Sequence, residues 1–343
     1  MGRKKRLLAV PDPWELTIVS AILRSLPEEE RSEWDNYLVL TTHAATMAFR
    51  DVVMPLADSY WTWAKVSNAG RLLGIPAPDA EQNAAELREQ LDIYHADEVW
   101  IWRAAEYTNR IVRAYPGCKV VIYDGGFNNH GPHPEPPAEL LPKLDRAYLM
   151  WHDYLPLPDY FNRLPLYGIP KETLLEIIRG LDEFVPEART VSAETSSDRP
   201  KVLVLGKDFA DYKGMSEEDG LNVHRKVVTF LIERGYAVLW KDHPKSTQNV
   251  MGVLADESNF PDGTFVKFSL NHLIPFELIA DKLGVVACVS SISNAMYTSE
   301  KLFGIPTYTF QHWTGAYTNE RFEFFAKLAA RHFKPIEAIP AAT

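Results

Sequence analysis

The sequence predicts an α/β protein built from two successive parallel-sheet domains. Two observations lead to this prediction. Short apolar segments typical of buried strands alternate with segments of helical pattern through most of the chain, and such alternation indicates parallel strands covered by helices. The polar stretch 193–200 interrupts the alternation, which restarts at once with Lys201–Leu205 (KVLVL). A polar, helix-poor stretch of this kind is typical of a domain boundary.

Strands and helices are predicted in both halves of the chain. In the first half we expect strands at 6–10, 36–41, 98–102 and 119–123, an aromatic-rich element at 58–65, and helices at 15–26, 81–94 and 104–114. In the second half we expect strands at 201–205, 236–240, 264–268 and 284–289, and helices at 222–234, 275–282, 292–301 and 321–331.

These elements form three predicted parts. An N-terminal Rossmann-like domain covers 1–195, a C-terminal Rossmann-like domain covers 196–318, and the segment 319–343 forms a helix that packs back on the N-terminal domain. Two such domains fit the glycosyltransferase B architecture, in which they face a cleft that holds the ligand. Because ligands of open parallel sheets bind beyond the carboxyl ends of the strands, the residues after each strand are the first candidates for a site.

The composition excludes one class of function and indicates a compartment. The 343 residues carry 36 basic and 46 acidic side chains, a formal net charge of −10, which argues against a nucleic-acid-binding protein. Cys118 and Cys288 each lie among apolar, strand-like residues, so we expect buried free thiols in a reducing cytoplasm. No apolar segment is long enough for a signal peptide or a membrane span.

The basic group near the N-terminus has two interpretations. Its members are Arg3, Lys4, Lys5 and Arg6. The first interpretation is a solvated lead-in to the first strand. The second is weak contact with an anionic membrane surface, where each clustered cation contributes about 1 kcal/mol. We therefore expect a cytoplasmic protein, with peripheral contact at the inner face of the membrane as the alternative.

Asp124 follows the apolar strand 119–123 and precedes two glycines, Gly125 and Gly126. Glycine allows a sharp turn and a close approach of a substrate to the backbone. A carboxylate at this place can accept a proton from an acceptor hydroxyl, which is the role of a general base. The structural alternative is an aspartate that stabilises an Asp-Gly turn.

His243 and Pro244 follow the strand 236–240 and are flanked by two lysines. An imidazole can hydrogen-bond a phosphate, or protonate it as a leaving group departs, and the lysines add positive charge. The alternative is a surface histidine in a proline turn. A second His-Pro pair begins at His133, but no predicted strand precedes it, so we discount it as a phosphate site.

Two further polar positions lie where predicted helices begin. Ser290 and Ser291 follow the strand 284–289 and open a helix, so they can cap it and bind a phosphate together with its free N–H groups. Glu277 begins a helix after Pro275, where its carboxylate can accept hydrogen bonds from both hydroxyls of a ribose. For both positions the alternative is ordinary first-turn helix chemistry without a ligand.

Several common ligand motifs are missing from the sequence. It contains no Asp-x-Asp motif, no GxxxxGK[ST] loop and no GxGxxG fingerprint, and these hold metal-bridged diphosphates, nucleoside triphosphates and dinucleotides. His130, His133 and His152 match no standard zinc spacing. We therefore expect no metal site and no cofactor, and interpret the three histidines as loop residues.

Together the motifs resemble those of bacterial sialyltransferases, in particular the polysialyltransferase and lipooligosaccharide sialyltransferase group. That group has an acid-acid-Gly, a His-Pro, a Pro-x-Glu and a Ser-Ser/Thr motif in this order. The matching segments here are Tyr123–Gly125, His243–Pro244, Pro275–Glu277 and Ser290–Ser291. The opening strand, proline turn and helix also look like the family's, so the resemblance spans most of the chain. The sequence departs from the family at Tyr123, where the family has the first acid of its pair.

The resemblance implies an inverting, metal-independent transfer of sialic acid from CMP-sialic acid to a glycan acceptor, such as capsule or lipooligosaccharide. By position, Asp124 is implied as the general base, and His243 as the residue that assists departure of the phosphate. The N-terminal domain is implied to bind the acceptor and the C-terminal domain the nucleotide-sugar. The implied donor-binding residues are Gly206 at the cytosine, Glu277 at the ribose, and Pro244, Ser290 and Ser291 near the phosphate.

Two alternatives remain open. Other cytidine-nucleotide transferases, which transfer Kdo or glycerol phosphate, also place His-Pro and Ser-Ser pairs after strands. A catalytically silent nucleotide-sugar-binding protein is the second alternative, and the loss of an acid at Tyr123 motivates it. The effect of Asp124→Ala on transfer separates an enzyme from a silent protein.

Overall fold

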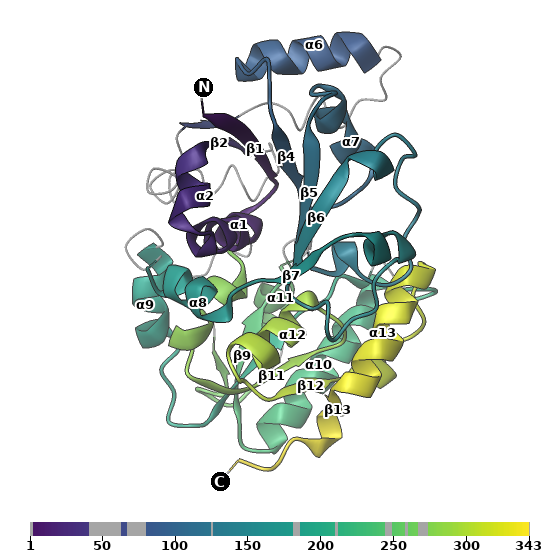
Figure 1. The fold of residues 1–343 in the computed structure, drawn as a ribbon. Helices are drawn as coiled ribbons and strands as arrows, with labels where there is room; N and C mark the ends of the chain where they lie inside the picture. Colours follow the sequence, from purple (N-terminus) through teal and green to yellow (C-terminus); the bar gives the residue numbers. More distant parts are fainter. Residues whose placement is uncertain are drawn as a thin grey trace. The chain divides into compact units, whose positions relative to one another are not determined.

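The chain forms two compact units, each built around one β-sheet (Figure 1). The computed structural model describes residues 3–40, 63–66, 80–124, 126–180, 186–209, 212–243, 249–257, 260–266 and 274–342. The first unit comprises residues 1–184 and the second residues 185–343. Helix α9 (Pro186–Glu194) lies within the second unit, whereas the sequence places the boundary after residue 195.

The first unit contains a seven-stranded sheet in the order β3-β2-β1-β4-β5-β6-β7. Every neighbouring pair is parallel, as the sequence predicts. In chain order the strands are Lys4–Val10 (β1), Trp34–Leu40 (β2), Trp63–Val66 (β3), Glu98–Ile101 (β4), Lys119–Tyr123 (β5), Leu144–Leu149 (β6) and Leu166–Gly168 (β7). Residues 7–10 of β1 and 120–123 of β5 are all buried, as expected for strands covered on both faces.

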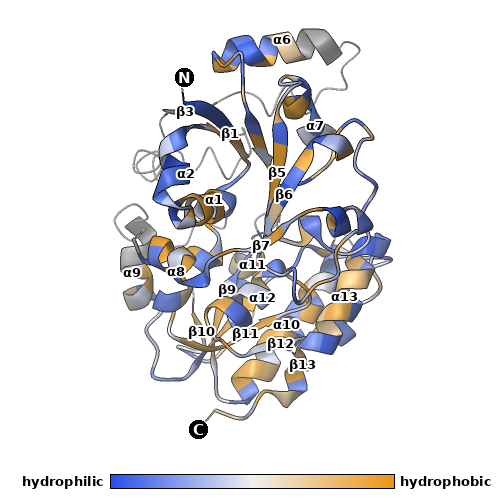
Figure 2. Ribbon diagram, in the orientation of Figure 1, coloured by the Kyte–Doolittle hydropathy of each residue, from blue (hydrophilic) through white to orange (hydrophobic). Residues whose placement is uncertain are grey.

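Helices of two kinds flank this sheet. The α-helices are Pro13–Ser25 (α1), Glu28–Glu33 (α2), Ala80–Leu91 (α6), Glu106–Arg113 (α7) and Lys171–Gly180 (α8), and the 3₁₀-helices are Gly126–Asn129 (η1), Leu141–Lys143 (η2) and Asp159–Arg163 (η3). Asp12 caps α1, since its carboxylate accepts the N–H groups of Trp14 and Glu15, a common helix start before Pro13. By contrast, α2 is hydrophilic throughout (Figure 2) and has no buried residue.

The sequence did not predict β6, β7 or α8. Strand β6 has the sequence LDRAYL, in which Asp145 and Arg146 interrupt the apolar pattern. The two side chains form an ion pair at 2.7 Å, and Arg146 also pairs with Glu98, so the charges are satisfied within the sheet. Of the aromatic-rich element predicted at 58–65, residues 58–62 lie outside the described part of the chain.

The second unit contains a six-stranded sheet in the order β10-β9-β8-β11-β12-β13. All of its neighbouring pairs are parallel as well. The strands are Lys201–Leu205 (β8), Ala237–Lys241 (β9), Phe265–Val266 (β10), Val285–Ser290 (β11), Thr307–Thr309 (β12) and Lys334–Pro335 (β13). The two predicted parallel-sheet domains are therefore confirmed.

In the second unit, the sequence did not predict α9 or the helix at 250–257, and two predicted helices take other forms. Besides α9, the α-helices are Glu217–Glu233 (α10), Val250–Glu257 (α11), Asn294–Tyr297 (α12) and Glu320–His332 (α13). The helix predicted at 275–282 is instead two 3₁₀ turns, Phe276–Leu278 (η6) and Ala280–Lys282 (η7). The helix predicted at 292–301 is the short α12 followed by a π-helical turn, Thr298–Leu302 (η8). Two 3₁₀ turns, Gln311–Trp313 (η9) and Ile336–Ala338 (η10), complete the unit.

The terminal helix α13 contacts β13 and η9 of its own unit. Its packing on the N-terminal domain stays a prediction.

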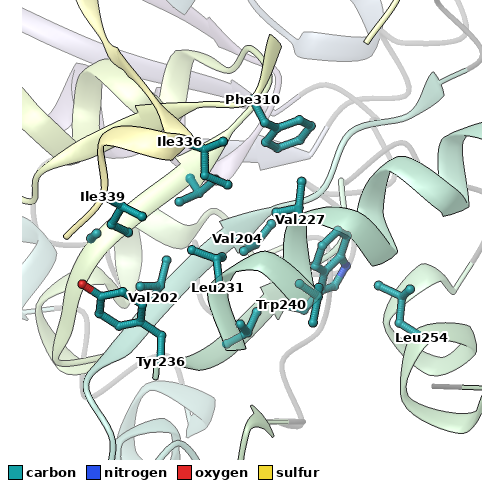
Figure 3. Packing of buried hydrophobic residues seen from close by; sticks show 14 of the residues in the cluster. Val202, Val204, Val227, Leu231, Tyr236, Trp240, Leu254, Phe310, Ile336 and Ile339 are labelled. Atoms are coloured by element: carbon teal, nitrogen blue, oxygen red, sulfur yellow. The ribbon is translucent and has the colours of Figure 1, made fainter. Parts of the chain in front are cut away.

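Packing of α10 against the sheet forms the core of the second unit (Figure 3). Val227 and Leu231 of α10 lie against Val202, Val204 and Trp240 from β8 and β9. All five side chains are buried, and burial of each stabilises the fold by roughly 1.5–3 kcal/mol. This core fixes the strands whose ends carry the predicted donor-binding residues.

The N-terminal basic group does not form one exposed patch. Arg6 is fully buried, with its guanidinium 3.0 Å from the Glu98 carboxylate and 3.1 Å from that of Glu30. The inclusion of Arg6 in a membrane-contacting surface is therefore wrong, because a buried and paired cation cannot reach a lipid headgroup. Lys4 is exposed but pairs with Glu33 at 2.9 Å. Within the described residues, no helix combines the length and the hydropathy that a membrane crossing requires.

The predicted state of the cysteines is confirmed. Cys118 and Cys288 are free and buried. Burial raises the pKa of the Cys118 thiol to about 11 and that of Cys288 to about 12, so both are neutral thiols near pH 7.

Candidate functional site

Three neighbouring strands of the second unit end in predicted site residues. Strand β8 lies between β9 and β11, and the carboxyl ends of parallel strands meet at one edge of a sheet. Gly206 follows β8, His243 follows β9 after one further residue, and Ser290 ends β11. The structure thus brings these three predicted residues to the same edge.

Direct hydrogen bonds join these strand ends. The backbone N–H of Gly206 donates to the carbonyl of Lys241 at 2.8 Å. The hydroxyl of Ser290 donates to the carbonyl of Leu205 at 3.1 Å. His243 is partly buried, and Pro244 lies outside the described residues.

Gly206 is packed so closely that a side chain does not fit without a shift. A Cβ atom at this position would lie 3.0 Å from Cζ2 of Trp240 and 3.2 Å from the carbonyl oxygen of Lys241. Contacts this short are repulsive. The structure therefore explains why glycine occurs at the end of β8.

The two serines are buried and do not cap the following helix. The exposed fraction is 1% for Ser290 and 0% for Ser291. The N-cap of α12 is Ser293, whose side chain accepts the N–H of Ala295 at 3.2 Å. The capping role expected for Ser290 and Ser291 is therefore wrong, because the helix begins two residues later than predicted, at Asn294.

Glu277 is buried within the 3₁₀ turn η6. The carboxylate of Glu277 is not stabilised by a helix dipole, since η6 is only three residues long. Its electrostatic neighbour is Lys241, the last residue of β9, which is also buried. Burial lowers the pKa of Lys241 to about 8, although the negative charges of Glu277 and Asp242 oppose this shift.

In the first unit, Asp124 directly follows β5 and is fully buried. Its carboxylate accepts the backbone N–H of Met150 at 2.6 Å and that of Gly126. Gly126 has a φ of 62°, a conformation that favours glycine. Burial raises the pKa of Asp124 to about 7, since the loss of hydration outweighs the two N–H groups that stabilise its charge. A carboxylate with this pKa is suited to act as a general base near neutral pH.

A second carboxyl, not predicted from the sequence, lies near Asp124. Glu15 lies in the first turn of α1 and is 6% exposed. Burial, followed by the charge of Asp12, raises its pKa well above the ordinary range, and Asp124 contributes in the same direction. The signal in the sequence was the pair of acids in PDPWE, directly after the first strand.

The first position of the family's acidic pair has a different role here. Tyr123 is fully buried, and its hydroxyl donates to the backbone carbonyl of Ala9. Tyr123 therefore belongs to the core of the first unit.

The discounted histidines form no metal site in the described part of the chain. There, no group of three or more His, Cys, Asp and Glu side chains is arranged to hold a metal ion. The His133-Pro134 pair follows the 3₁₀-helix η1 rather than a strand, as the sequence predicts.

Comparison with known proteins adds family information. The model of the alpha-2,8-polysialyltransferase family matches residues 146–312. The predicted resemblance to the polysialyltransferases is confirmed. The matched segment, just under half of the chain, is similar to that family, and the match supports a glycosyltransferase. The matched segment contains Gly206, His243, Glu277, Ser290 and Ser291 but not Asp124, so the assignment of Asp124 rests on its own surroundings. No curated protein matches the chain in sequence.

Several solved structures share the fold of this chain. UDP-GlcNAc 2-epimerase from Neisseria meningitidis, bound to UDP-GlcNAc, has a TM-score of 0.60 and 13% identity, covering 97% of this chain and 87% of its own. The Methanocaldococcus jannaschii UDP-GlcNAc 2-epimerase has a TM-score of 0.56 and 11% identity, with coverage of 90% and 83%. A Listeria monocytogenes structure described as a UDP-N-acetylglucosamine 2-epimerase has a TM-score of 0.55 and 12% identity, covering 90% of this chain and 79% of its own.

At these identities the similarity concerns the fold alone. It confirms the predicted glycosyltransferase B type of fold, with two α/β units that each contain a parallel sheet.

Proposed function

We propose that this protein transfers sialic acid from CMP-sialic acid to a hydroxyl group of a glycan acceptor, with inversion at the anomeric carbon and without a metal ion. The observation that best supports this proposal is the edge of the second sheet. Gly206, His243 and Ser290 follow or end three adjacent strands there, within the segment matched by the polysialyltransferase family. A surface glycan, such as capsule or lipooligosaccharide, is the proposed acceptor, and the cytoplasm is the proposed compartment.

Each residue takes the role that the family resemblance implies for its position. Asp124 removes the proton from the acceptor hydroxyl, for which a pKa of about 7 is favourable. His243 donates a hydrogen bond or a proton to the departing phosphate. Ser290 and Ser291, with Pro244 beside His243, line the phosphate position. Glu277 accepts hydrogen bonds from the ribose hydroxyls, and Gly206 lies against the cytosine.

The reaction that these roles describe is balanced. A bond forms between the acceptor oxygen and the anomeric carbon, while the bond from that carbon to the phosphate oxygen breaks. The proton of the acceptor moves to Asp124, and CMP leaves with the electron pair of the broken bond. Because CMP is a good leaving group, orientation of the two substrates and stabilisation of the phosphate charge supply most of the catalysis.

The proposal is tested by measuring CMP release and product formation with CMP-sialic acid and a panel of glycan acceptors, with and without EDTA. We expect acceptor-dependent release that EDTA does not reduce. Asp124→Asn should lower the rate by a factor of roughly 10² to 10⁴. Transfer from CMP-Kdo or CDP-glycerol alone would instead support another cytidine-nucleotide transferase. Binding of CMP without turnover of any of these donors would support a silent binding protein.

A further inference from the structure

The side chain of Asn129 ties two strand ends together beside Asp124. Asn129 is the last residue of the 3₁₀-helix η1 and is fully buried. Its amide nitrogen donates a hydrogen bond of 2.9 Å to the carbonyl of Trp102 and one of 3.0 Å to the carbonyl of Tyr123. Trp102 directly follows β4, and Tyr123 ends β5. One side chain therefore links the carboxyl ends of two adjacent strands.

These two hydrogen bonds also fix the orientation of the Asn129 amide. An amide nitrogen carries two protons, and both partners are carbonyl oxygens, which only accept hydrogen bonds. The reversed amide would bring its own oxygen against the two carbonyls, and this contact is repulsive. The nitrogen of Asn129 is therefore the end that holds the strands, and a side chain with fewer than two N–H protons cannot make both bonds.

The carboxylate of Asp124 is held at the same edge of the sheet from two directions. One oxygen accepts the backbone N–H of Gly126, the first residue of η1, and the other accepts that of Met150 at 2.6 Å. Met150 directly follows β6, and β5 lies between β4 and β6 (Figure 1). Because an ionised carboxylate offers about four lone-pair sites, these two bonds leave room for the proton of an acceptor hydroxyl.

The helix η1 is thus fixed at both of its ends. Gly126 at its start donates to the Asp124 carboxylate, and Asn129 at its end donates to the two carbonyls. Asp124 has no exposed surface, so a displacement of η1 changes both the position of this carboxylate and its access to water. A general base acts only within hydrogen-bond reach of the proton, and a misplacement of about 1 Å can lower a rate by about 100-fold.

We infer that Asn129 is a positioning residue: its amide holds η1 against the ends of β4 and β5, and thereby holds the Asp124 carboxylate in place and away from water. This inference rests on the proposed function, in which Asp124 removes the proton of the acceptor, and adds a residue on which that step depends. Asn129 lies outside the matched segment 146–312, so its role is argued from its contacts alone.

The test measures initial rates of sialic acid transfer by the full chain and by Asn129→Ala between pH 5 and 9. At pH 8 we expect kcat/KM for the acceptor to fall about 10- to 100-fold, with the KM for CMP-sialic acid changed less than about threefold. Because loss of the two hydrogen bonds admits water to Asp124, its pKa should move from about 7 toward the ordinary value of 3.8. The rising limb of the pH profile should therefore move to lower pH, by about one unit or more.

Asn109→Ala is the matched control. Asn109 is 1% exposed, and its amide nitrogen donates to the carboxylate of Glu139 at 2.9 Å, so this substitution also removes a buried amide from the first unit. We expect it to lower the urea midpoint and to leave kcat/KM and the limb of the pH profile unchanged.

A second control concerns Glu15 of α1, which interacts electrostatically with Asp124. The pH profiles are measured again with Glu15→Gln present in both proteins. The shift caused by Asn129→Ala should persist, because it arises from hydration of Asp124 rather than from the charge of Glu15.

The outcomes separate this inference from the proposed function. If the unchanged protein transfers no sialic acid, or if Asp124→Asn transfers it equally fast, the proposed donor or the proposed base is wrong and the inference fails with it. If Asp124→Asn is slow but the limb of Asn129→Ala stays in place, Asn129 supports only the stability of the fold, and the inference alone is wrong. A limb that moves as far in Asn109→Ala, or a shift that disappears with Glu15→Gln, also contradicts it. Should Asn129→Ala fail to fold, Asn129→Ser decides, since a serine hydroxyl has one proton and cannot bridge two carbonyls.

Discussion

The hydroxyl of Tyr123 donates a 2.6 Å hydrogen bond to the backbone carbonyl oxygen of Ala9. Tyr123 ends β5 and Ala9 lies in β1, and the strand β4 runs between them in the sheet. The bond therefore spans two strand spacings and links β5 to β1 across β4. It also explains how the chain accommodates a tyrosine beside Asp124, since this side chain is buried in the core.

We predict that Tyr123→Phe lowers stability and leaves catalysis nearly intact. Loss of the hydroxyl leaves the buried Ala9 carbonyl without this donor, which lowers the free energy of unfolding by about 1–2 kcal/mol. Transfer activity should stay within about threefold, because the hydroxyl contacts the backbone. Urea unfolding and initial rates measure the two effects. A loss of activity of 100-fold with unchanged stability would assign a catalytic role to Tyr123.

Asp124 gives activity and stability opposite pH dependences. As a base it must be ionised, so kcat/KM should rise about tenfold per pH unit up to its pKa of about 7 and then level off. For stability, the folded-state pKa lies above the ordinary value of 3.8, so the protonated form favours folding. The stability contributed by Asp124 is complete below pH 4 and is lost as the pH rises to about 7.

Asp124→Asn separates this contribution from those of other groups. Between pH 5 and 8 the free energy of unfolding of the unchanged protein should fall by about 1–3 kcal/mol more than that of Asp124→Asn. The charge of Asp124 contributes to the raised pKa of Glu15, so the difference between the two proteins includes the response of Glu15. Urea titrations at the two pH values measure this free energy. If it falls equally in the two proteins between pH 5 and 8, Asp124 is ionised throughout this range.

The sequence predicted the elements in which a short apolar strand is followed by a turn residue. Strands β5 and β8 have the predicted bounds, 119–123 and 201–205. The prediction failed where a strand contains charged residues whose partners lie elsewhere in the sequence. Strand β6 contains Asp145 and Arg146, which appear incompatible with a buried strand until Glu98 and Lys119 are seen to pair with them.

The candidate site was predictable to a similar extent. The place of Gly206, His243 and Ser290 at strand ends followed from the alternation of strands and helices. The different hydrogen bonds of Ser290 and Ser291 did not, because their partners Leu205 and Tyr212 contact the serines only in the folded chain. Glu15 was missed for the same reason, since its neighbour Asp124 lies more than a hundred residues away in sequence.

Gly206→Ala is expected to destabilise the second unit and to weaken nucleotide binding. The added Cβ would lie 3.0 Å from the Trp240 ring and 3.2 Å from the Lys241 carbonyl, and relief of such overpacking costs about 1–3 kcal/mol. Gly315→Ala is the matched control, since its Cβ would be 3.8 Å from the nearest atom, the carbonyl oxygen of Lys213. We expect the control to change stability by less than about 0.5 kcal/mol. Equal effects of the two substitutions would contradict the tight packing at Gly206.

Glu98 links two arginines in the first sheet, and its loss should be among the most damaging substitutions there. Its carboxylate accepts hydrogen bonds from Arg6, from the indole of Trp100 at 3.0 Å, and twice from Arg146. Burial alone would raise the pKa of Glu98, but the hydrogen bond and charge of Arg146, followed by the charge of Arg6, hold it below the ordinary value of 4.5. The stability that this carboxylate contributes is thus present above about pH 4.5 and is lost as the pH falls through its lowered pKa.

Glu98→Gln tests this network against an exposed pair of the same kind. Removal of one partner leaves buried cations uncompensated, which costs about 3–5 kcal/mol, so we expect a loss of this size at pH 7 and a smaller one at pH 3. The control is Glu33→Gln, which removes the Lys4–Glu33 pair, where both side chains are more than half exposed. Such pairs contribute about 0–1 kcal/mol. Urea unfolding of both variants at pH 7 and pH 3 measures the two losses. If Glu98→Gln lowers the free energy of unfolding by less than about 1 kcal/mol, the arginines find other partners or water.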